Sequence, residues 1–144
     1  MSQPTPFALS QRFSQLVGRT VTFRQVTTRP DSKTKKVYGI YSVLPQQTPV
    51  VVQADLCLLG SFAGSLVGLP DNVVKEHLRT TPIEEMLVDA IHEVLNVASA
   101  TVSDEGRVVF KKMVTDPAYI EGTAAKMFRS PDLRSYFAAA SSFR

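Results

Sequence analysis

The sequence has few of the residues that build covalent cross-links or metal sites. Cys57 is the only cysteine among 144 residues, so the chain cannot form an intramolecular disulfide. The two histidines, His77 and His92, lack the spacing of a metal-binding pair, and neither has a cysteine close by in the sequence. The sequence therefore predicts no metal site and no cofactor of its own.

Long hydrophobic runs are also missing. No apolar stretch approaches the roughly 18 residues that indicate a membrane-spanning helix. The segment Met1–Pro6 is polar and interrupted by prolines, unlike a signal peptide. We therefore expect a cytoplasmic protein that has no contact with a membrane. A chain of this length usually folds as one unit, so we expect residues 1–144 to form a single domain.

The net charge is only +3, but the charges are unevenly distributed: acidic residues are scarce at both ends of the chain, and basic residues are scarce in the middle. Residues 1–50 contain one acidic side chain, residues 51–105 contain two basic ones, and residues 106–144 contain three acidic ones. The basic ends could suit a nucleic acid. However, no aromatic residue is interleaved with the basic run Asp31–Lys36, which is typical of a solvated loop. We therefore expect no nucleic-acid partner.

Hydrophobic periodicity predicts helices and strands that follow one another along the chain. The expected elements are a helix at Phe7–Val17 ended by Gly18, strands at Thr20–Val26, Val37–Leu44 and Val50–Leu56, a glycine-rich helix from Cys57, a short helix at Pro70–Thr80, a helix from Pro82 to about Val102, a strand at Glu105–Val114 and one or two helical turns after Asp116. Residues 132–144 fit a helix or a strand. The fold class is α/β of the α+β type, with an antiparallel-rich sheet covered by two long helices.

The glycine-rich segment predicts a helix that packs closely against another part of the backbone. Gly60, Gly64 and Gly68 recur every four residues, which places them in one row on a helix. Such a row allows another backbone to approach closely. The spacing does not match a phosphate-binding loop, because no Gly-x-Gly-x-x-Gly or Gly-Lys-Ser/Thr pattern is present. Cys57, which precedes this row between apolar residues, is expected to be a small buried thiol.

The helix predicted from Pro82 has a narrow polar stripe. At 100° per residue, Asp89, Glu93 and Asn96 fall within about 60° of one another. The apolar side chains fall on the opposite side: Leu87, Ala90, Ile91, Val94, Leu95 and Ala98. Acidic residues are common on the solvated face of any amphipathic helix. Asparagine forms helices less readily than glutamine or glutamate, so its presence there hints at a use.

This stripe resembles the signature of a known family. Asp89-x3-Glu93-x2-Asn96 is similar to the Asp/Ser-x3-Glu-x2-Asn motif of the CheC/CheX/FliY family, phosphatases that act on chemotaxis response regulators. The flanking "HEVLNVASA" and the order of elements from about Val37 to Pro117 are similar too. One motif copy is present, as in CheX-like members. The chain departs from the family pattern at Pro117, which stands slightly closer to the Asn than the family's proline does.

The resemblance implies a fold, a reaction and roles for individual residues. It implies a CheC/CheX-like domain whose C-terminal segment is a closing strand, and a homodimer joined through sheet edges. The partner would be the phosphorylated receiver domain of a response regulator, which supplies its own Mg²⁺. Asn96 would hold the attacking water, and Glu93 would pair with a lysine of the receiver. Three further residues of the helix would extend the docking face: Glu85, Asp89 and His92.

The same resemblance leaves a second function open. The family includes relatives without phosphatase motifs, which serve as binding parts of the flagellar switch. The chain could therefore be a non-catalytic module that docks a receiver domain or a motility component through the same acidic helix. Because one fold serves both purposes, the overall likeness does not choose between an enzyme and a binding module.

Overall fold

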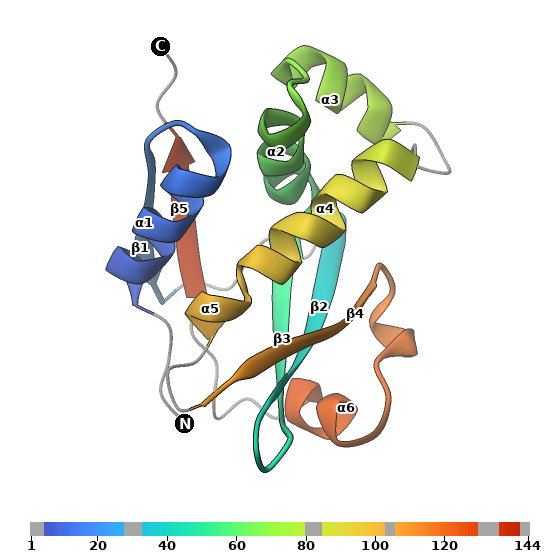
Figure 1. Ribbon diagram of the computed structural model, residues 1–144. Helices are drawn as coiled ribbons and strands as arrows, with labels where there is room; N and C mark the ends of the chain where they lie inside the picture. The colour runs from blue at the N-terminus through green and yellow to red at the C-terminus, as the bar shows by residue number, and fades with distance from the viewer. Residues whose placement is uncertain (1–4, 28–32, 80–84, 103–105, 130–135, 142–144) are drawn as a thin grey trace.

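The structure is a computed structural model, and it describes residues 5–27, 33–79, 85–102, 106–129 and 136–141 (Figure 1). The helices are α1 (Pro6–Val17), α2 (Leu56–Val67), α3 (Asp71–Arg79), α4 (Glu85–Val97), α5 (Ser99–Val102) and α6 (Gly122–Arg129), with a short 3₁₀ helix η1 (Pro117–Tyr119). The strands are β1 (Val21–Val26), β2 (Lys36–Val43), β3 (Thr48–Asp55), β4 (Val108–Val114) and β5 (Tyr136–Ser141). Helices and antiparallel strands together make an α+β fold, as the sequence predicts.

The strands form two antiparallel sheets. One has the order β3-β2-β4, and the other is the pair β1-β5. The hairpin of β2 and β3 confirms the prediction from the sequence, with Val43 opposite Thr48 at its closed end. The C-terminal segment is a strand where it is described, because Tyr136–Ser141 pairs along the whole of β1. The rest of that segment lies outside the described residues.

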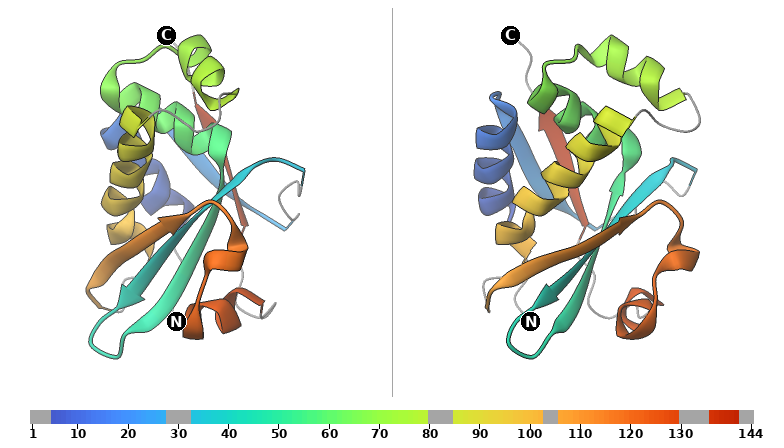
Figure 2. Two further views of the ribbon diagram at one scale, coloured as in Figure 1. Left: turned by 90° about the vertical axis from the view of Figure 1, so that its right-hand side faces the viewer. Right: turned by 45° about the vertical axis from the view of Figure 1, so that its right-hand side comes forward.

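The central strand β2 is buried on both faces, which explains its nearly continuous apolar sequence. Tyr38 and Ile40 pack with Ile120 and Ala124 beside α6. Val37 belongs to the larger core, which α1, α2, α3 and α4 share on the other face. Figure 2 shows α2 and α4 on one side of the three-stranded sheet and α6 on the other. Because side chains alternate along a strand, β2 joins the two layers of the core.

The predicted helix from Pro82 to Val102 is interrupted in the structure. Pro82 lies outside the described residues, α4 ends at Val97, and α5 begins at Ser99. At the break, the Thr101 amide donates to the Ala98 carbonyl at 2.9 Å, and the Thr101 hydroxyl donates to the same oxygen at 2.7 Å. A hydrogen bond between residues three apart has 3₁₀ geometry, which is wound more tightly than an α-helix, so the regular α-helix is interrupted here. With 12 residues in α2 and 13 in α4, neither covering helix is unusually long.

Two glycines of α2 permit the close packing that the sequence predicts. A Cβ atom on Gly60 would lie 2.7 Å from Leu78 Cδ1, and one on Gly64 would lie 2.3 Å from Val74 Cγ2. Both contacts are with α3. Gly68 has a different role from the one predicted, because it follows the last helical residue with φ of 79° and caps α2.

We expect Gly64→Ala to destabilise the protein by about 1–3 kcal/mol. The β-branched Val74 has little rotamer freedom in a helix, so it cannot move away from an added methyl group. Alanine's better helix propensity, worth about 1 kcal/mol, offsets only part of this. The free energy of unfolding from urea titration measures the effect. Gly60→Ala is the matched control and should cost less, because the flexible end of Leu78 can rotate away. A Gly64→Ala protein as stable as the wild type would contradict this packing.

Candidate functional site

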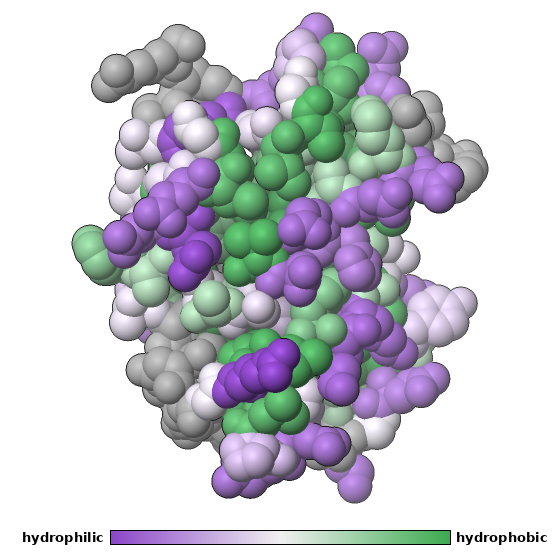
Figure 3. Space-filling model, in the orientation of Figure 1, coloured by the Kyte–Doolittle hydropathy of each residue, from purple (hydrophilic) through white to green (hydrophobic). Residues whose placement is uncertain are grey.

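The polar stripe of α4 lies on the surface, opposite the core, as the sequence predicts. Its five polar residues are all exposed: Glu85, Asp89, His92, Glu93 and Asn96. The opposite face of the same helix is buried: Leu87, Ala90, Ile91, Val94 and Leu95. Figure 3 shows hydrophilic side chains along α4. The five exposed residues, which we call the α4 stripe, therefore form one continuous surface that a second protein can reach.

The key side chains of the α4 stripe are available for a partner. Within the part of the chain that the structure describes, no hydrogen bond or ion pair engages the side chains of Asp89, Glu93 or Asn96. Glu93 and Asn96 are three residues apart, which brings their Cβ atoms to about 5–6 Å on a helix surface. A carboxylate and an amide thus stand side by side, one able to pair with a cation and the other able to donate and accept hydrogen bonds.

A buried tyrosine holds the turn of α4 that contains Asn96. The Tyr41 hydroxyl donates a hydrogen bond of 2.6 Å to the carbonyl oxygen of Leu95, and Tyr41 is only 1% exposed. Tyr41 is not among the site residues that the sequence predicts. A signal was present, because a tyrosine in an otherwise apolar strand usually finds a polar partner for its hydroxyl when buried.

His92 contacts the neighbouring strand β4 at one edge of the α4 stripe. Its ring meets the ring of Phe110 edge to face, with centroids 4.7 Å apart and planes at 68°. Phe110 in turn lies 5.3 Å from Tyr41, measured between ring centroids. Three rings therefore connect the surface of α4 with the buried strand β2. The His92 side chain is therefore exposed to solvent while its ring packs on Phe110.

A hydrophobic surface lies next to the α4 stripe. Three of the exposed large hydrophobic residues are Leu66 (37%), Val67 (40%) and Met86 (45%). Leu66 and Val67 end α2, and Met86 is in the first turn of α4. Figure 3 shows a hydrophobic band that runs from the junction of α2 and α3 down between α1 and α4. Polar and apolar surfaces thus adjoin, as the apolar core and the polar rim of a protein interface do.

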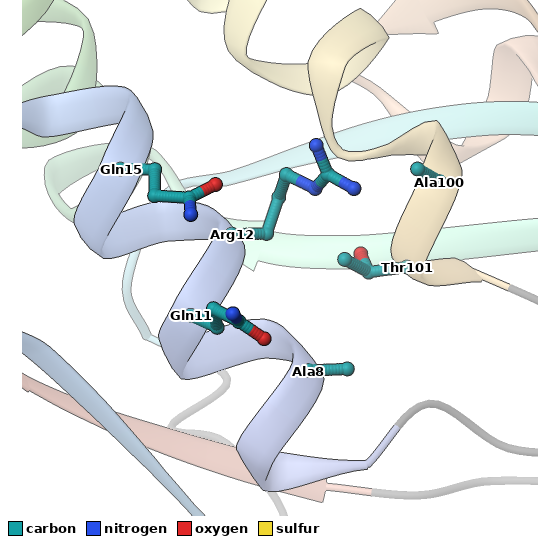
Figure 4. Close-up of a pocket in the computed structure, with 6 residues that line it drawn as sticks. All are labelled: Ala8, Gln11, Arg12, Gln15, Ala100 and Thr101. Carbon is teal, nitrogen blue, oxygen red and sulfur yellow. The ribbon is translucent and has the colours of Figure 1, made fainter.

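A hollow of about 330 Å³ lies between α1 and α5. Figure 4 shows Arg12 reaching from α1 toward α5, with Gln11 and Gln15 on the same side of α1. Ala8, Ala100 and Thr101 form the remainder of its lining. One guanidinium and two amides give this hollow hydrogen-bond donors for a polar group. Sequence patterns gave no sign of it, because it depends on how α1 meets the end of the interrupted helix.

Cys57 is exposed, which corrects the prediction of a buried thiol. It lines a second hollow, of about 240 Å³, between α2 and α3, together with Ser61 and Lys75. The error came from the apolar neighbours of Cys57 in the sequence. On a helix, residues four apart share a face, and Cys57 shares the outer face of α2 with Ser61. Leu56 and Leu59 take the buried positions instead.

The described residues contain no group of three or more His, Cys, Asp or Glu side chains placed to hold a metal ion. Within the same residues, no helix has the length and hydrophobicity required to cross a membrane. Pro117 begins η1. In Figure 1, η1 follows β4, at the end of the strand that lies far from α5. It therefore lies away from the turn of Asn96.

No protein-family model, curated protein or solved structure matches the chain significantly. The resemblance to the CheC/CheX/FliY family therefore stays a prediction from the sequence.

Proposed function

We propose that this protein removes the phosphoryl group from an aspartyl-phosphate on the receiver domain of a response regulator. The observation that supports this most is the joint exposure of Glu93 and Asn96 on one face of α4. The two side chains have the spacing of the phosphatase motif and are available to a partner. A stripe packed against another element would have excluded docking through this helix.

The reaction asks for little chemistry from this chain. An aspartyl-phosphate is a reactive acyl phosphate, and Mg²⁺ bound by the receiver neutralises part of its charge. A water oxygen forms a bond to phosphorus while the bond from phosphorus to the aspartyl oxygen breaks. The bonding electrons leave with the aspartate carboxylate, and the water's protons stay on the inorganic phosphate. What the receiver lacks is a water molecule held in line with the breaking bond.

Asn96 is suited to hold that water. Its amide oxygen accepts a hydrogen bond from the water, and its amide nitrogen donates one to a phosphoryl oxygen. An amide does not need to act as a base, because positioning supplies most of the rate enhancement in phosphoryl transfer. The rigid backbone of α4 gives this side chain a defined starting position. Asn96 is therefore the proposed catalytic residue.

Glu93 is proposed to pair with a lysine of the receiver, one turn of helix away from Asn96. The pair would fix the direction of docking, while Glu85, Asp89 and His92 extend the contact. The middle of the chain, residues 51–105, has nine acidic and two basic side chains, which favours a cationic partner surface. Met86, an exposed residue in the first turn of α4, would add apolar contact.

The second candidate is a binding module without catalysis, and the exposed α4 stripe supports it equally. In that case Glu93 would contribute to binding and Asn96 would have no effect on the lifetime of the phosphate. The two functions therefore differ in what Asn96 does rather than in where the partner docks.

We expect Glu93→Ala to weaken receiver binding by about 2 kcal/mol, or roughly 30-fold, and to slow dephosphorylation at subsaturating concentrations by a similar factor. Removing one member of an interfacial charge pair leaves the other desolvated and unpaired. Binding is measured by titration of a fluorescently labelled receiver stabilised with beryllofluoride, and the rate by loss of ³²P from the phosphorylated receiver.

Glu76→Ala is the matched control, because Glu76 is an exposed glutamate of α3 outside the α4 stripe. It should bind like the wild type. Equal affinity of Glu93→Ala and wild type for a receiver that the wild type binds would contradict docking through this side chain.

A further inference from the structure

The hydrogen bond between Tyr41 and α4 reaches the peptide group that joins Leu95 to Asn96. The carbonyl that accepts the hydroxyl belongs to Leu95, and the same rigid peptide plane includes the backbone nitrogen of Asn96. The distance from the hydroxyl oxygen to the carbonyl oxygen is 2.6 Å, and the bond is buried. Any rotation of this peptide, which would turn the Asn96 side chain, has to break that bond.

This bond lies at the end of α4, where backbone carbonyls need partners from outside the helix. The last four carbonyls of an α-helix lack intrahelical partners, and α4 ends at Val97. The Val94 carbonyl accepts the amide of Ala98 at 3.0 Å, and the next carbonyl, that of Leu95, accepts the Tyr41 hydroxyl. The sheet thus supplies a side-chain cap at the point where the regular helix stops. Without it, the terminal turn would be free to fray.

The surroundings of Tyr41 keep its hydroxyl in this one place. A Cβ atom on the neighbouring Gly39 would lie 3.1 Å from the Tyr41 ring and 3.2 Å from Leu95 Cδ2. Phe110 covers another side of the ring, with centroids 5.3 Å apart. Burial also raises the pKa of Tyr41 far above its usual range, so the hydroxyl keeps the proton that it donates. The absence of a Cβ at residue 39 thus lets Tyr41 and Leu95 approach each other, and Phe110 packs against the tyrosine ring in this orientation.

We propose that Tyr41 is a positioning residue for Asn96: its buried hydroxyl, bonded to the Leu95 carbonyl, sets the orientation in which the Asn96 amide meets the partner. This inference rests on the proposed function for its effect on catalysis. Tyr41 touches neither the partner nor the phosphate. It acts through the peptide that precedes Asn96.

Tyr41→Phe tests this inference, because it keeps the buried ring and removes only the hydroxyl. At saturating concentrations, we expect the single-turnover dephosphorylation rate to fall about tenfold, since small misplacements of a positioned group have large effects on rate. The half-saturating concentration should stay unchanged, because docking uses other side chains. In an Asn96→Ala background, Tyr41→Phe should change the rate less than twofold, because no amide is left to position.

Tyr38→Phe is the matched control. It removes a hydroxyl from the same strand on the opposite face, where Tyr38 packs beside α6. Its rate should equal that of the wild type. Two results would overturn the positioning role: a Tyr41→Phe loss of the same size with and without Asn96, or an unchanged rate in Tyr41→Phe when Asn96→Ala is strongly impaired.

Amide hydrogen exchange separates this inference from the proposed function, because it needs no receiver. In Tyr41→Phe, the backbone amides of residues 96–98 should exchange at least tenfold faster, while those of residues 87–91 keep wild-type rates. If no receiver is dephosphorylated by the wild type, the proposed function fails, and faster exchange at residues 96–98 alone still supports Tyr41 as the group that orders this turn. Unchanged exchange at residues 96–98 would overturn the inference whether or not the protein is a phosphatase.

Discussion

Asn96→Ala is expected to lower the single-turnover dephosphorylation of a cognate receiver by about 10²-fold or more. Removal of one positioned polar group in a transition state typically costs about 3 kcal/mol, which corresponds to that factor. The variant should bind the receiver as the wild type does, because the amide acts after docking. Stability should hold or rise by a few tenths of a kcal/mol, since alanine is the better helix former and Asn96 is exposed.

Rate and affinity are measured on the same ³²P-labelled receiver, with a thermal melt to confirm folding. Asn72→Ala is the matched control, because Asn72 is an exposed asparagine of α3 outside the α4 stripe. Its rate should equal that of the wild type. If Asn96→Ala and the wild type dephosphorylate the receiver at the same rate, Asn96 is not catalytic and the binding module remains.

Phe62→Ala is expected to destabilise the fold by about 3–5 kcal/mol, a large share of the usual 5–15 kcal/mol of a small domain. Phe62 of α2 is 2% exposed. Its ring centroid lies 5.0 Å from that of Phe13 in α1 and 6.4 Å from that of Phe23 in β1. These three rings join α2 to the β1-β5 side of the molecule, so loss of the Phe62 ring leaves a cavity between the layers.

Urea denaturation followed by circular dichroism gives the free energy of unfolding. Phe7→Ala is the matched control for the same chemical change, because Phe7 of α1 is 77% exposed. Its effect should stay within about 0.5 kcal/mol. If the two variants lose similar stability, then α1 and β1 do not pack on α2 through these rings.

Local patterns predicted the elements that depend on a few neighbouring residues. The helix α1 ends at Val17, and the following Gly18 takes the left-handed conformation that caps a helix. The apolar and polar sides of α4 follow the 100° spacing of a helix, so the α4 stripe could be placed before the structure was known. The β2-β3 hairpin follows from two strand-like apolar runs separated by a turn. In each case, the residues that determine the element are close to one another in the sequence.

Features that depend on contacts between distant parts of the sequence could not be predicted from local patterns. The division of the strands into two sheets comes from the pairing of β1 with β5, which are more than 100 residues apart. The interruption at Ala98 falls within a sequence that has the spacing of a continuous helix. The bond from Tyr41 to the Leu95 carbonyl spans 54 residues. A tyrosine in an apolar strand indicates that its hydroxyl needs a partner, but no local pattern indicates which group that partner is. The exposure of Cys57 was predictable from helical spacing, but its apolar neighbours outweighed that signal.

The most direct measurement is the lifetime of the phosphoryl group on receiver domains from the same genome, each labelled with ³²P and incubated with a substoichiometric amount of this protein. We predict that at least one receiver loses its label faster, releases inorganic phosphate over repeated turnovers, and returns close to its intrinsic lifetime when Asn96→Ala replaces the wild type. If every receiver keeps its intrinsic lifetime in the presence of the wild-type protein, the proposed phosphatase function is wrong.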